Sequence, residues 1–451
     1  MTDTPDPGEI DLDHLTLTGS VKAVNDHLRA IAGPATGDLT RRAADAQLRS
    51  YLEPGCFPEA VRRLAARHLL VLVGEEDSGR RLGAIALLSR MSLAESTITV
   101  LSPAAGVTEL LTGIEYEPGR AYLLHDWIAA SAGRSDLVDL ARKLAELGSY
   151  LVVTRSGALS AASEVELAWA APDLGELYDL CLNSLDRRAG VAADVLARGR
   201  ELAQRLHTPA EVVRLAARLA RGEPPADEVA TWFDTKPPLG EVLAVAALAF
   251  AHRLAEPAFG QQLARLERLC RDTGAGPLAR SIGGPLVEVA DGRVAFRAAH
   301  QRGQVLAELA GRYGFWLWQP LRAWVRSLPS QGAAVQVRAA AGLALLARHS
   351  IKEVRQEFLE VWALGSAAER VAAANVLSYM CADDTLAPEA LRIALEWSDD
   401  PRDRRAEVAA VALGGGPAVR YPADCRRRLR DLESAGGRVA SVAARSLALL
   451  P

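Results

Sequence analysis

Short apolar runs alternate with helix-forming segments between residues 37 and 172, and this alternation constrains the fold more than any other feature of the sequence. The runs are HLLVLVG (68–74), TITVLS (97–102), AYLLHDW (121–127), SYLVVTRS (149–156) and, as a fifth candidate, VELAWAA (165–171). The helical patterns RRLGAIALLSRM and SDLVDLARKLAELG lie between them. Because strands alternate with helices and the strands are continuously apolar, the sequence predicts a three-layer α/β domain with a mainly parallel sheet.

The strand pattern nearly disappears after residue 173. The segment TPAEVVRLAARLARG has apolar residues at helical spacing, and its first residues form an N-cap signal of threonine, proline and an acid. The exception is 276–298, where two alternating runs meet at Asp291-Gly292 and predict a β-hairpin. A group of helices followed by one hairpin predicts a helical and winged-helix connector over 173–330.

The tail, residues 331–451, is helical and internally repetitive. Pairs of small residues precede Leu345, Leu377, Leu413 and Leu447, and these leucines are 32, 36 and 34 residues apart. A period of this length, with small residues that let helices approach closely, is typical of an α-solenoid. The tail resembles HEAT-type repeats. At the other end, residues 1–36 form a polar lead-in with one helical pattern, VKAVNDHLRAI.

Composition excludes several classes of protein. The 451 residues are 49% hydrophobic and 24% charged, which is ordinary for a globular protein and is enough to build several cores. The net charge of −4 gives no indication of nucleic-acid binding. The start, MTDTPDPGEIDLD, has no signal-peptide pattern, and the longest apolar run, 242–251, is too short to span a bilayer. Five widely separated cysteines are typical of reduced thiols, so we expect a cytoplasmic protein without a membrane segment.

The stretch GEEDSGRR, residues 74–81, follows the first apolar run and has the glycine spacing of a phosphate-binding loop, G-x-x-x-x-G-K-[ST]. Gly74 and Gly79 take the glycine positions, after a strand and before a helix. Arg80 stands at the lysine position, where it keeps the charge that contacts phosphate. Arg81 stands at the hydroxyl position and cannot coordinate a cation. The loop therefore has the form of a nucleotide site with altered contents.

Acidic residues fill the middle of the same loop. Glu75, Glu76 and Asp77 precede Ser78, and each would face a bound phosphate at short range. One such like-charge pair costs about 1 kcal/mol in water and more when it is desolvated. We therefore expect Mg-nucleotide binding to be abolished or severely weakened.

Two later strands end in residues that would complete a nucleotide site. Asp126 ends the third apolar run where an aspartate commonly holds magnesium, but Trp127 follows in place of a catalytic acid. We expect Arg81 to pair with Asp126 and to occupy the metal position. Arg155 ends the fourth run at the position of a γ-phosphate sensor, and we expect it to pair with a loop acid instead.

The order of these motifs resembles the signal-transduction ATPases with numerous domains, the group that includes the NACHT and apoptotic ATPases. The likeness covers roughly residues 60–330 and is followed by the repeat tail. It implies a nucleotide-gated switch in which the repeats sense a ligand and another region recruits an effector. This chain departs from the family pattern at the lysine, hydroxyl and catalytic-acid positions.

Other motifs have plainer interpretations. His125-Asp126 could belong to a metal site, but the other histidines show no ligand spacing. The aromatic cluster at 315–318 could be an interaction surface or a packed junction, and we favour the junction. The basic run 426–430 is flanked by acids, which favours a solvated helix face. The hairpin has two arginines and two acids, which gives little support for DNA binding.

The sequence predicts an α/β plus α protein with a polar lead-in (1–36), a degenerate phosphate-loop NTPase-like domain (37–172), a helical and winged-helix connector (173–330) and HEAT-like repeats (331–451). The vestigial nucleotide site comprises Gly74, Ser78, Gly79, Arg80, Arg81, Asp126 and Arg155. We expect no catalytic residue, no metal and no cofactor, with ATP or ADP bound weakly if at all.

The expected function is regulatory or scaffolding, with a protein partner bound by the repeats. The alternatives are an ATP-dependent signalling switch that retains nucleotide binding and, less favoured, a DNA-binding regulator that uses the winged-helix segment. The oligomeric state and the identity of the partner stay open.

Overall fold

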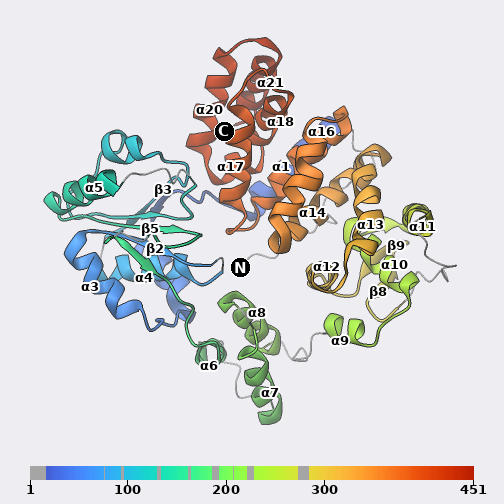
Figure 1. The fold of residues 1–451 in the computed structure, drawn as a ribbon, viewed down its shortest axis with the longest axis horizontal. Coiled ribbons are helices and arrows are strands. Elements are labelled where there is room, and N and C mark those ends of the chain that lie inside the picture. The colour runs from blue at the N-terminus through green and yellow to red at the C-terminus, as the bar shows by residue number, and fades with distance from the viewer. Residues whose placement is uncertain are drawn as a thin grey trace. The chain divides into compact units, whose positions relative to one another are not determined.

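A computed structural model describes residues 17–75, 77–92, 96–128, 134–160, 164–184, 192–206, 208–220, 228–272 and 284–450 (Figure 1). The predictions that concern Glu76, the acidic start and residues 276–283 lie outside these described residues. The chain divides into two units, Ala35–Ala226 and Met1–Pro34 together with Asp227–Pro451.

The first unit contains a six-stranded sheet with the order β1-β3-β4-β5-β2-β6. Its strands are β1 (Gly37–Leu39), β2 (Leu69–Val73), β3 (Ile98–Leu101), β4 (Ala121–Leu124), β5 (Tyr150–Arg155) and β6 (Glu166–Ala168). All neighbouring pairs are parallel except β1 and β3. The mainly parallel sheet with helices that the sequence predicts is therefore confirmed. The antiparallel edge strand β1 was not expected.

Helices cover both faces of this sheet. One face packs against α2 (Arg41–Gln47), α3 (Phe57–Arg67) and α4 (Arg80–Met91), and the other against the π-helical turn η3 (Glu109–Gly113) and α5 (Arg134–Glu146). Side chains of β2 alternate between the two cores: Leu70 and Leu72 join the first, while Leu69, Val71 and Val73 join the second. Because a strand presents successive residues to opposite faces, a strand between two helical layers must be apolar throughout.

Three helices complete the first unit: α6 (Leu174–Ser184), α7 (Ala193–Ala203) and α8 (Pro209–Ala220). They share a small core that includes Tyr178 and Leu219. The predicted N-cap signal at α8 is confirmed, because Glu211 N donates to Thr208 Oγ1 and Thr208 N donates to Glu211 Oε2. This reciprocal capping box explains where α8 begins.

The second unit begins with helices and a small antiparallel sheet of order β7-β9-β8. Its elements are α9 (Glu228–Asp234), α10 (Leu239–Phe250), β7 (Leu254–Ala255), α11 (Glu256–Asp272), β8 (Val287–Ala290), β9 (Arg293–Phe296), α12 (Gln301–Arg312) and α13 (Phe315–Ser327). The hairpin predicted between β8 and β9 is confirmed. Asp291 and Gly292 both have positive φ, at 52° and 71°, as a tight two-residue hairpin turn requires. In α13, Trp318 and Trp324 are buried while Trp316 is exposed.

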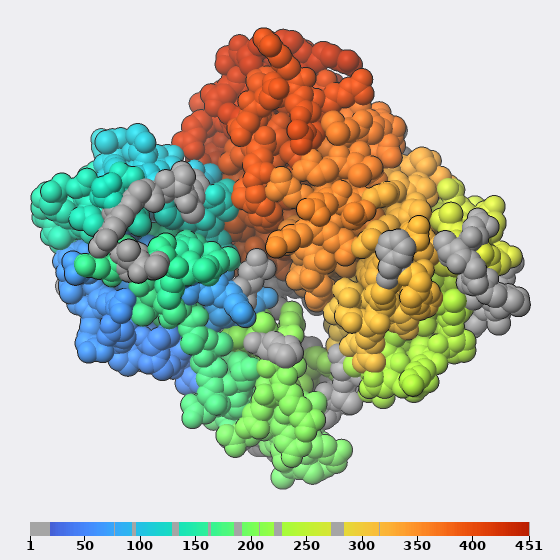
Figure 2. All heavy atoms as spheres, viewed as in Figure 1, coloured from blue at the N-terminus to red at the C-terminus, as the bar shows by residue number. Residues whose placement is uncertain are grey.

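The tail of the second unit is a stack of helices. They are α14 (Ala333–Val354), α15 (Glu360–Ala363), α16 (Ala367–Met380), α17 (Ala387–Ser398), α18 (Arg404–Leu413), α19 (Gly416–Arg420), α20 (Pro422–Ser434) and α21 (Gly437–Ala448). The repeated small-residue motifs fall in α14, α16, α18 and α21, and each of these helices contacts the next in that order. Figure 2 shows this tail as a continuous packed body, coloured from orange to red.

The N-terminal helix α1 (Leu17–Ile31) belongs to this same unit. It packs against α14, α16 and α19, more than 300 residues away in the sequence (Figure 1). Val24 and Leu28 of α1 are buried. The helical pattern at the start of the chain is thus confirmed, and the structure adds that it is a packed part of the tail.

Candidate functional site

The loop between β2 and α4 lies at the carboxyl end of the sheet's strands. Gly79 has a left-handed φ of 84° and directly precedes α4, and Asp77 also has a positive φ, of 58°. Ser78 Oγ donates to the Glu75 carbonyl at 2.8 Å, which closes the loop on itself. Because the N-cap residue of α4 is Gly79, it has no side chain with which to cap the first turn.

Trp169 packs closely against two glycines, Gly74 at the start of the loop and Gly83 in α4. A Cβ atom on Gly74 would lie 2.7 Å from the Trp169 carbonyl oxygen, and one on Gly83 would lie 2.1 Å from the Trp169 ring. Both distances are too short for any side chain, so glycine is required at each position by packing. Packing against Trp169 therefore explains why position 74 is a glycine, whether or not the loop binds phosphate. Sequence reasoning placed Trp169 in a strand candidate but gave no sign of this contact.

Arg80 reaches across the sheet end into the site. Its side chain is only 4% exposed, and its Nη2 lies 3.3 Å from Asp126 Oδ1. The same nitrogen donates to Ser156 Oγ at 3.1 Å, while Nη1 is buried with no hydrogen-bond partner in the described structure. The hypothesis gave the pairing with Asp126 to Arg81, whereas the structure assigns it to Arg80, the first residue of α4. Arg81 makes interactions of its own.

Asp126 is held in position by the end of β5. Its φ is 49°, a left-handed conformation that aspartate tolerates better than most residues. Its backbone N–H donates to Thr154 Oγ1 at 2.9 Å. His125 Nδ1 lies 2.9 Å from the same hydroxyl, and His125 Nε2 lies 3.2 Å from Asp126 Oδ2. Thr154 therefore orients both residues that end the third apolar run.

Arg155 forms the second ion pair of the site. Its Nη2 lies 2.8 Å from Glu166 Oε1, and Glu166 also accepts hydrogen bonds from Ser160 N and Ser160 Oγ. Burial opposes ionisation of Glu166, but the hydrogen bonds from Arg155 and Ser160 outweigh it, so the pKa of this carboxyl lies below its ordinary value. Arg155 does pair with an acid, as expected, although the acid begins β6 instead of lying in a loop.

The residues present do not fit a Mg-nucleotide. One oxygen of Asp126 faces Arg80 and the other faces His125, so the carboxylate that would hold the ion already has two partners. The residue at the hydroxyl position, Arg81, cannot bind a cation. Among the described residues, no group of three or more histidine, cysteine, aspartate or glutamate side chains could hold a metal ion. In this arrangement the Asp126 carboxylate lies between the Arg80 guanidinium and the His125 ring.

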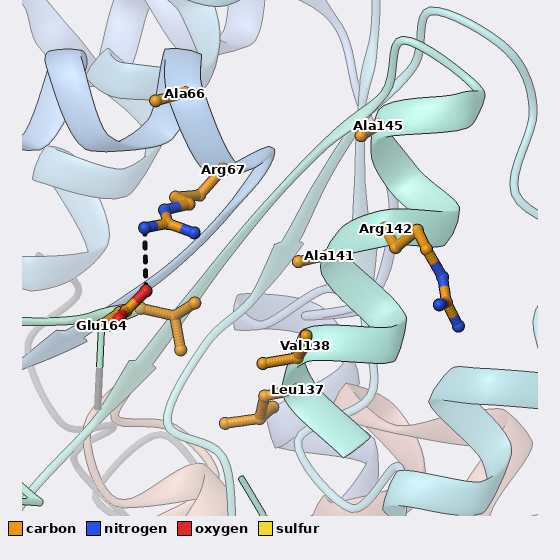
Figure 3. Close-up of a pocket in the computed structure, with 9 residues that line it drawn as sticks. Ala66, Arg67, Leu137, Val138, Ala141, Arg142, Ala145 and Glu164 are labelled. Atoms are coloured by element: carbon orange, nitrogen blue, oxygen red, sulfur yellow. Dashed lines mark ion pairs between the residues drawn. The ribbon is translucent and has the colours of Figure 1, made fainter. Parts of the chain in front are cut away.

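A pocket of about 260 Å³ lies elsewhere in the first unit, between α3, α5 and the residues before β6 (Figure 3). Its lining comprises Ala66, Arg67, Leu137, Val138, Ala141, Arg142, Ala145, Glu164 and Val165. Arg67 and Glu164 form an ion pair at 2.8 Å on one side of it. None of the predicted site residues lines this pocket, so it is separate from the loop at 74–81.

Comparison of the chain with protein-family models and with curated proteins finds no match. Across the described residues, no helix combines the length and the apolar character that crossing a membrane requires.

Proposed function

We propose that this protein is a regulatory or scaffolding protein of the signal-transduction ATPase type whose phosphate loop has become a structural element. The observation that carries the proposal is the ion pair between Arg80 and Asp126. In a working site the residue at position 80 would contact phosphate and the residue at 126 would bind magnesium. Here each is the other's partner, and the network needs no ligand to neutralise it.

The strand order supports a nucleotide-binding ancestry. β2 lies between β5 and β6. The chain that leaves β2 continues to β3, toward one edge of the sheet, whereas the chain that leaves β5 continues to β6, at the other edge. In parallel α/β sheets, ligands bind at the carboxyl edge where the strand order reverses. The loop at 74–81 follows β2 at such a position.

The residue after Asp126 argues against hydrolysis. Trp127 is buried, and its Nε1 donates to the Ala105 carbonyl at 2.9 Å. Its backbone N–H donates to the Thr154 carbonyl. An indole has no basic atom, so it cannot polarise an attacking water as a carboxylate does. The position of a catalytic acid is thus used to fasten the loop after β4.

Recognition of a protein partner is assigned to the tail. Stacked helical repeats present extended surfaces, and such surfaces commonly bind other proteins. The stack of α14, α16, α18 and α21 is built in this way. In this proposal the first unit is a fixed body and the tail carries the binding function.

Phosphate release from ATP tests the proposal. We expect the wild type and the Asp126→Ala variant to release phosphate at the same rate as buffer. Asp139→Ala, at an exposed position on α5, serves as the matched control. If the wild type hydrolyses ATP and only the Asp126 variant loses that activity, the protein is an enzyme and the proposal is wrong.

The second candidate is a switch that binds nucleotide without this aspartate. It is favoured by one observation: Arg80 keeps a cation at the start of α4, where the helix dipole also attracts anions. This candidate requires the Arg80 guanidinium to leave Asp126 when nucleotide arrives. Nucleotide binding that is lost on changing Arg80 would support it.

A further inference from the structure

The pocket of about 260 Å³ in the first unit is a hollow lined mainly by small and aliphatic side chains (Figure 3). Leu140 and Leu144 of α5 belong to the core between this helix and the sheet, where both are buried. A neighbouring face of α5 forms one wall of the pocket and comprises Leu137, Val138, Ala141 and Ala145. Because Ala141, Ala145 and, on α3, Ala66 are small, they leave space that larger side chains would fill.

Val138 belongs to this wall and is 55% exposed. A single exposed valine means little on a protein surface. In Figure 3, however, Leu137 and Val138 point from α5 toward the side of the pocket where Arg67 and Glu164 lie. Arg142 points to the far side of the helix. An aliphatic group in the hollow would therefore cover Val138 and remove apolar area from water, which favours binding.

The side of the pocket that faces α5 carries a pair of opposite charges. Arg67 Nη2 lies 2.8 Å from Glu164 Oε2, and the two side chains are 55% and 60% exposed. An ion pair as exposed as this one contributes at most about 1 kcal/mol. In this respect it differs from the pair at the loop, where the Arg80 side chain is 4% exposed. The charges of Arg67 and Glu164 are therefore accessible to a ligand that enters from solvent.

Both members of this pair can bind a second charged group. A guanidinium has five N–H donors in a planar fork, and a carboxylate accepts about four hydrogen bonds. Arg67 can therefore bind a carboxylate while it keeps its contact with Glu164. Glu164 takes part in a further interaction within the protein, and its negative charge also attracts an ammonium group. A ligand that carries both charges side by side would satisfy both residues at once.

The hollow sets the size and character of the rest of the ligand. Pockets for drug-sized ligands have volumes of about 300–1,000 Å³, so a hollow of about 260 Å³ suits a smaller molecule. Its wall on α5 is aliphatic, which favours a short hydrocarbon group. In an α-amino acid the ammonium, the carboxylate and the side chain all leave one carbon atom. The two charges are thus adjacent, as they are in the Arg67–Glu164 pair, and the side chain points away from both.

We propose that this pocket binds a free α-amino acid with an aliphatic side chain of about four carbon atoms, as in leucine. Arg67 binds the carboxylate, Glu164 binds the ammonium group, and the side chain packs against Val138 and Ala141. The inference goes beyond the function proposed above, because it gives the first unit a small-molecule ligand. It is independent of the loop at 74–81, since no residue of that loop lines the pocket.

The experiment is a titration of the full chain, labelled on its alanine, leucine and valine methyl groups, with L-leucine in NMR without nucleotide. We expect the methyl signals of Val138, Ala141 and Ala145 to shift with a Kd on the order of 1 mM. L-Alanine should bind at least about tenfold more weakly, because it lacks three carbon atoms that the wall buries. 4-Methylpentanoate and 3-methylbutylamine each lack one charge of leucine and should bind at least about threefold more weakly.

Variants locate the ligand. Ala141→Leu fills the hollow and should weaken L-leucine binding at least about tenfold, whereas Ala65→Leu, at an exposed position of α3 outside the pocket, should leave it unchanged. Arg67→Gln and Glu164→Gln should each weaken binding at least about threefold. Arg62→Gln removes an exposed ion pair from the same helix and should have no effect. Unchanged hydrogen exchange of the strand amides shows that each variant is folded.

The titration of the wild type can overturn the inference without any variant. No shift of these methyl signals at about 10 mM L-leucine would do so. Equal binding of 4-methylpentanoate or 3-methylbutylamine would mean that the ion pair takes no part, which also contradicts the proposal. N-acetyl-L-leucinamide carries neither charge, and if it binds as tightly as L-leucine, the hollow takes an apolar side chain of a protein instead. ATP hydrolysis would overturn the function proposed above and leave these results unchanged.

Discussion

Replacing Asp126 by asparagine should damage the first unit more than removing its partner does. Asparagine tolerates the left-handed φ of 49°, so the change isolates the loss of charge. It leaves Arg80, which is 4% exposed, without an opposite charge. Breaking a buried pair from one side costs about 3–5 kcal/mol, and because the Asp126 side chain is 19% exposed we expect about 3 kcal/mol.

Arg80→Met removes the other half of the pair and behaves differently. It loses the ion pair with Asp126 and the hydrogen bond to Ser156, but it also removes a buried Nη1 that has no partner in the described structure. Because leaving a buried donor unsatisfied costs about 1–3 kcal/mol, the net loss should be only about 1–2 kcal/mol. Adding Arg80→Met to Asp126→Asn should therefore recover part of the stability that the single change loses.

Hydrogen exchange of β2, β4 and β5 amides measures these free energies within the first unit, where a global unfolding curve would mix both units. Arg142→Met is the control, because its pair with Asp139 is exposed and should change stability by less than about 0.5 kcal/mol. Strictly additive effects of the two changes, or an Asp126→Asn effect no larger than the control, would refute the reasoning.

Three further predictions follow from packing, charge and burial. Gly83→Ala should cost the first unit about 1–3 kcal/mol in hydrogen exchange of its strand amides, because the new methyl group meets the Trp169 ring, whereas Gly303→Ala on α12, where a Cβ meets nothing within 4 Å, should leave the amides of α12 equally or better protected. Since the pKa of Glu166 is lowered, its ionised form stabilises the fold above the ordinary pKa of 4.5, and this contribution disappears as the pH falls through the lower folded value. A Glu166→Gln variant should show less acid sensitivity in a pH series of melting temperatures. A thiol reagent should label Cys56 first in the native protein, because the other four thiols are buried and burial raises their pKa values.

The sheet could be predicted because its central strands are buried on both faces. A continuous run such as LLVLV in β2 leaves few alternatives to a buried strand. β1 could not be predicted, since the three residues Gly37–Leu39 carry no periodic pattern and form the edge of the sheet by pairing with β3. The hairpin at Asp291-Gly292 could be predicted because its turn requires residues that tolerate positive φ.

The sequence singled out Arg80 and Asp126, but it did not predict that they pair with each other. It did predict that Arg155 pairs with an acid. Which of two adjacent arginines faces the sheet depends on the helical phase of α4, because successive residues point about 100° apart. Sequence alone does not set that phase, so the choice between Arg80 and Arg81 required the structure.

Contacts between distant parts of the chain also could not be predicted from the sequence. Nothing in residues 17–31 indicates that they pack on α14 and α16, because the pairing depends on shape and polar groups brought together from distant parts of the chain. The contact of Trp169 with Gly74 and Gly83 is similar, since the residues come from different strands and helices. Local patterns predict elements, and they predict such partners only when a repeat or a motif fixes the spacing.

Calorimetric titration of the purified protein with ATP and ADP, each with and without magnesium, tests the central claim most directly. The account predicts no binding at about 1 mM nucleotide, because Arg80 and Asp126 neutralise each other and the loop is acidic. Binding at micromolar concentration that depends on Arg80 would contradict it and make a nucleotide-gated switch the correct description.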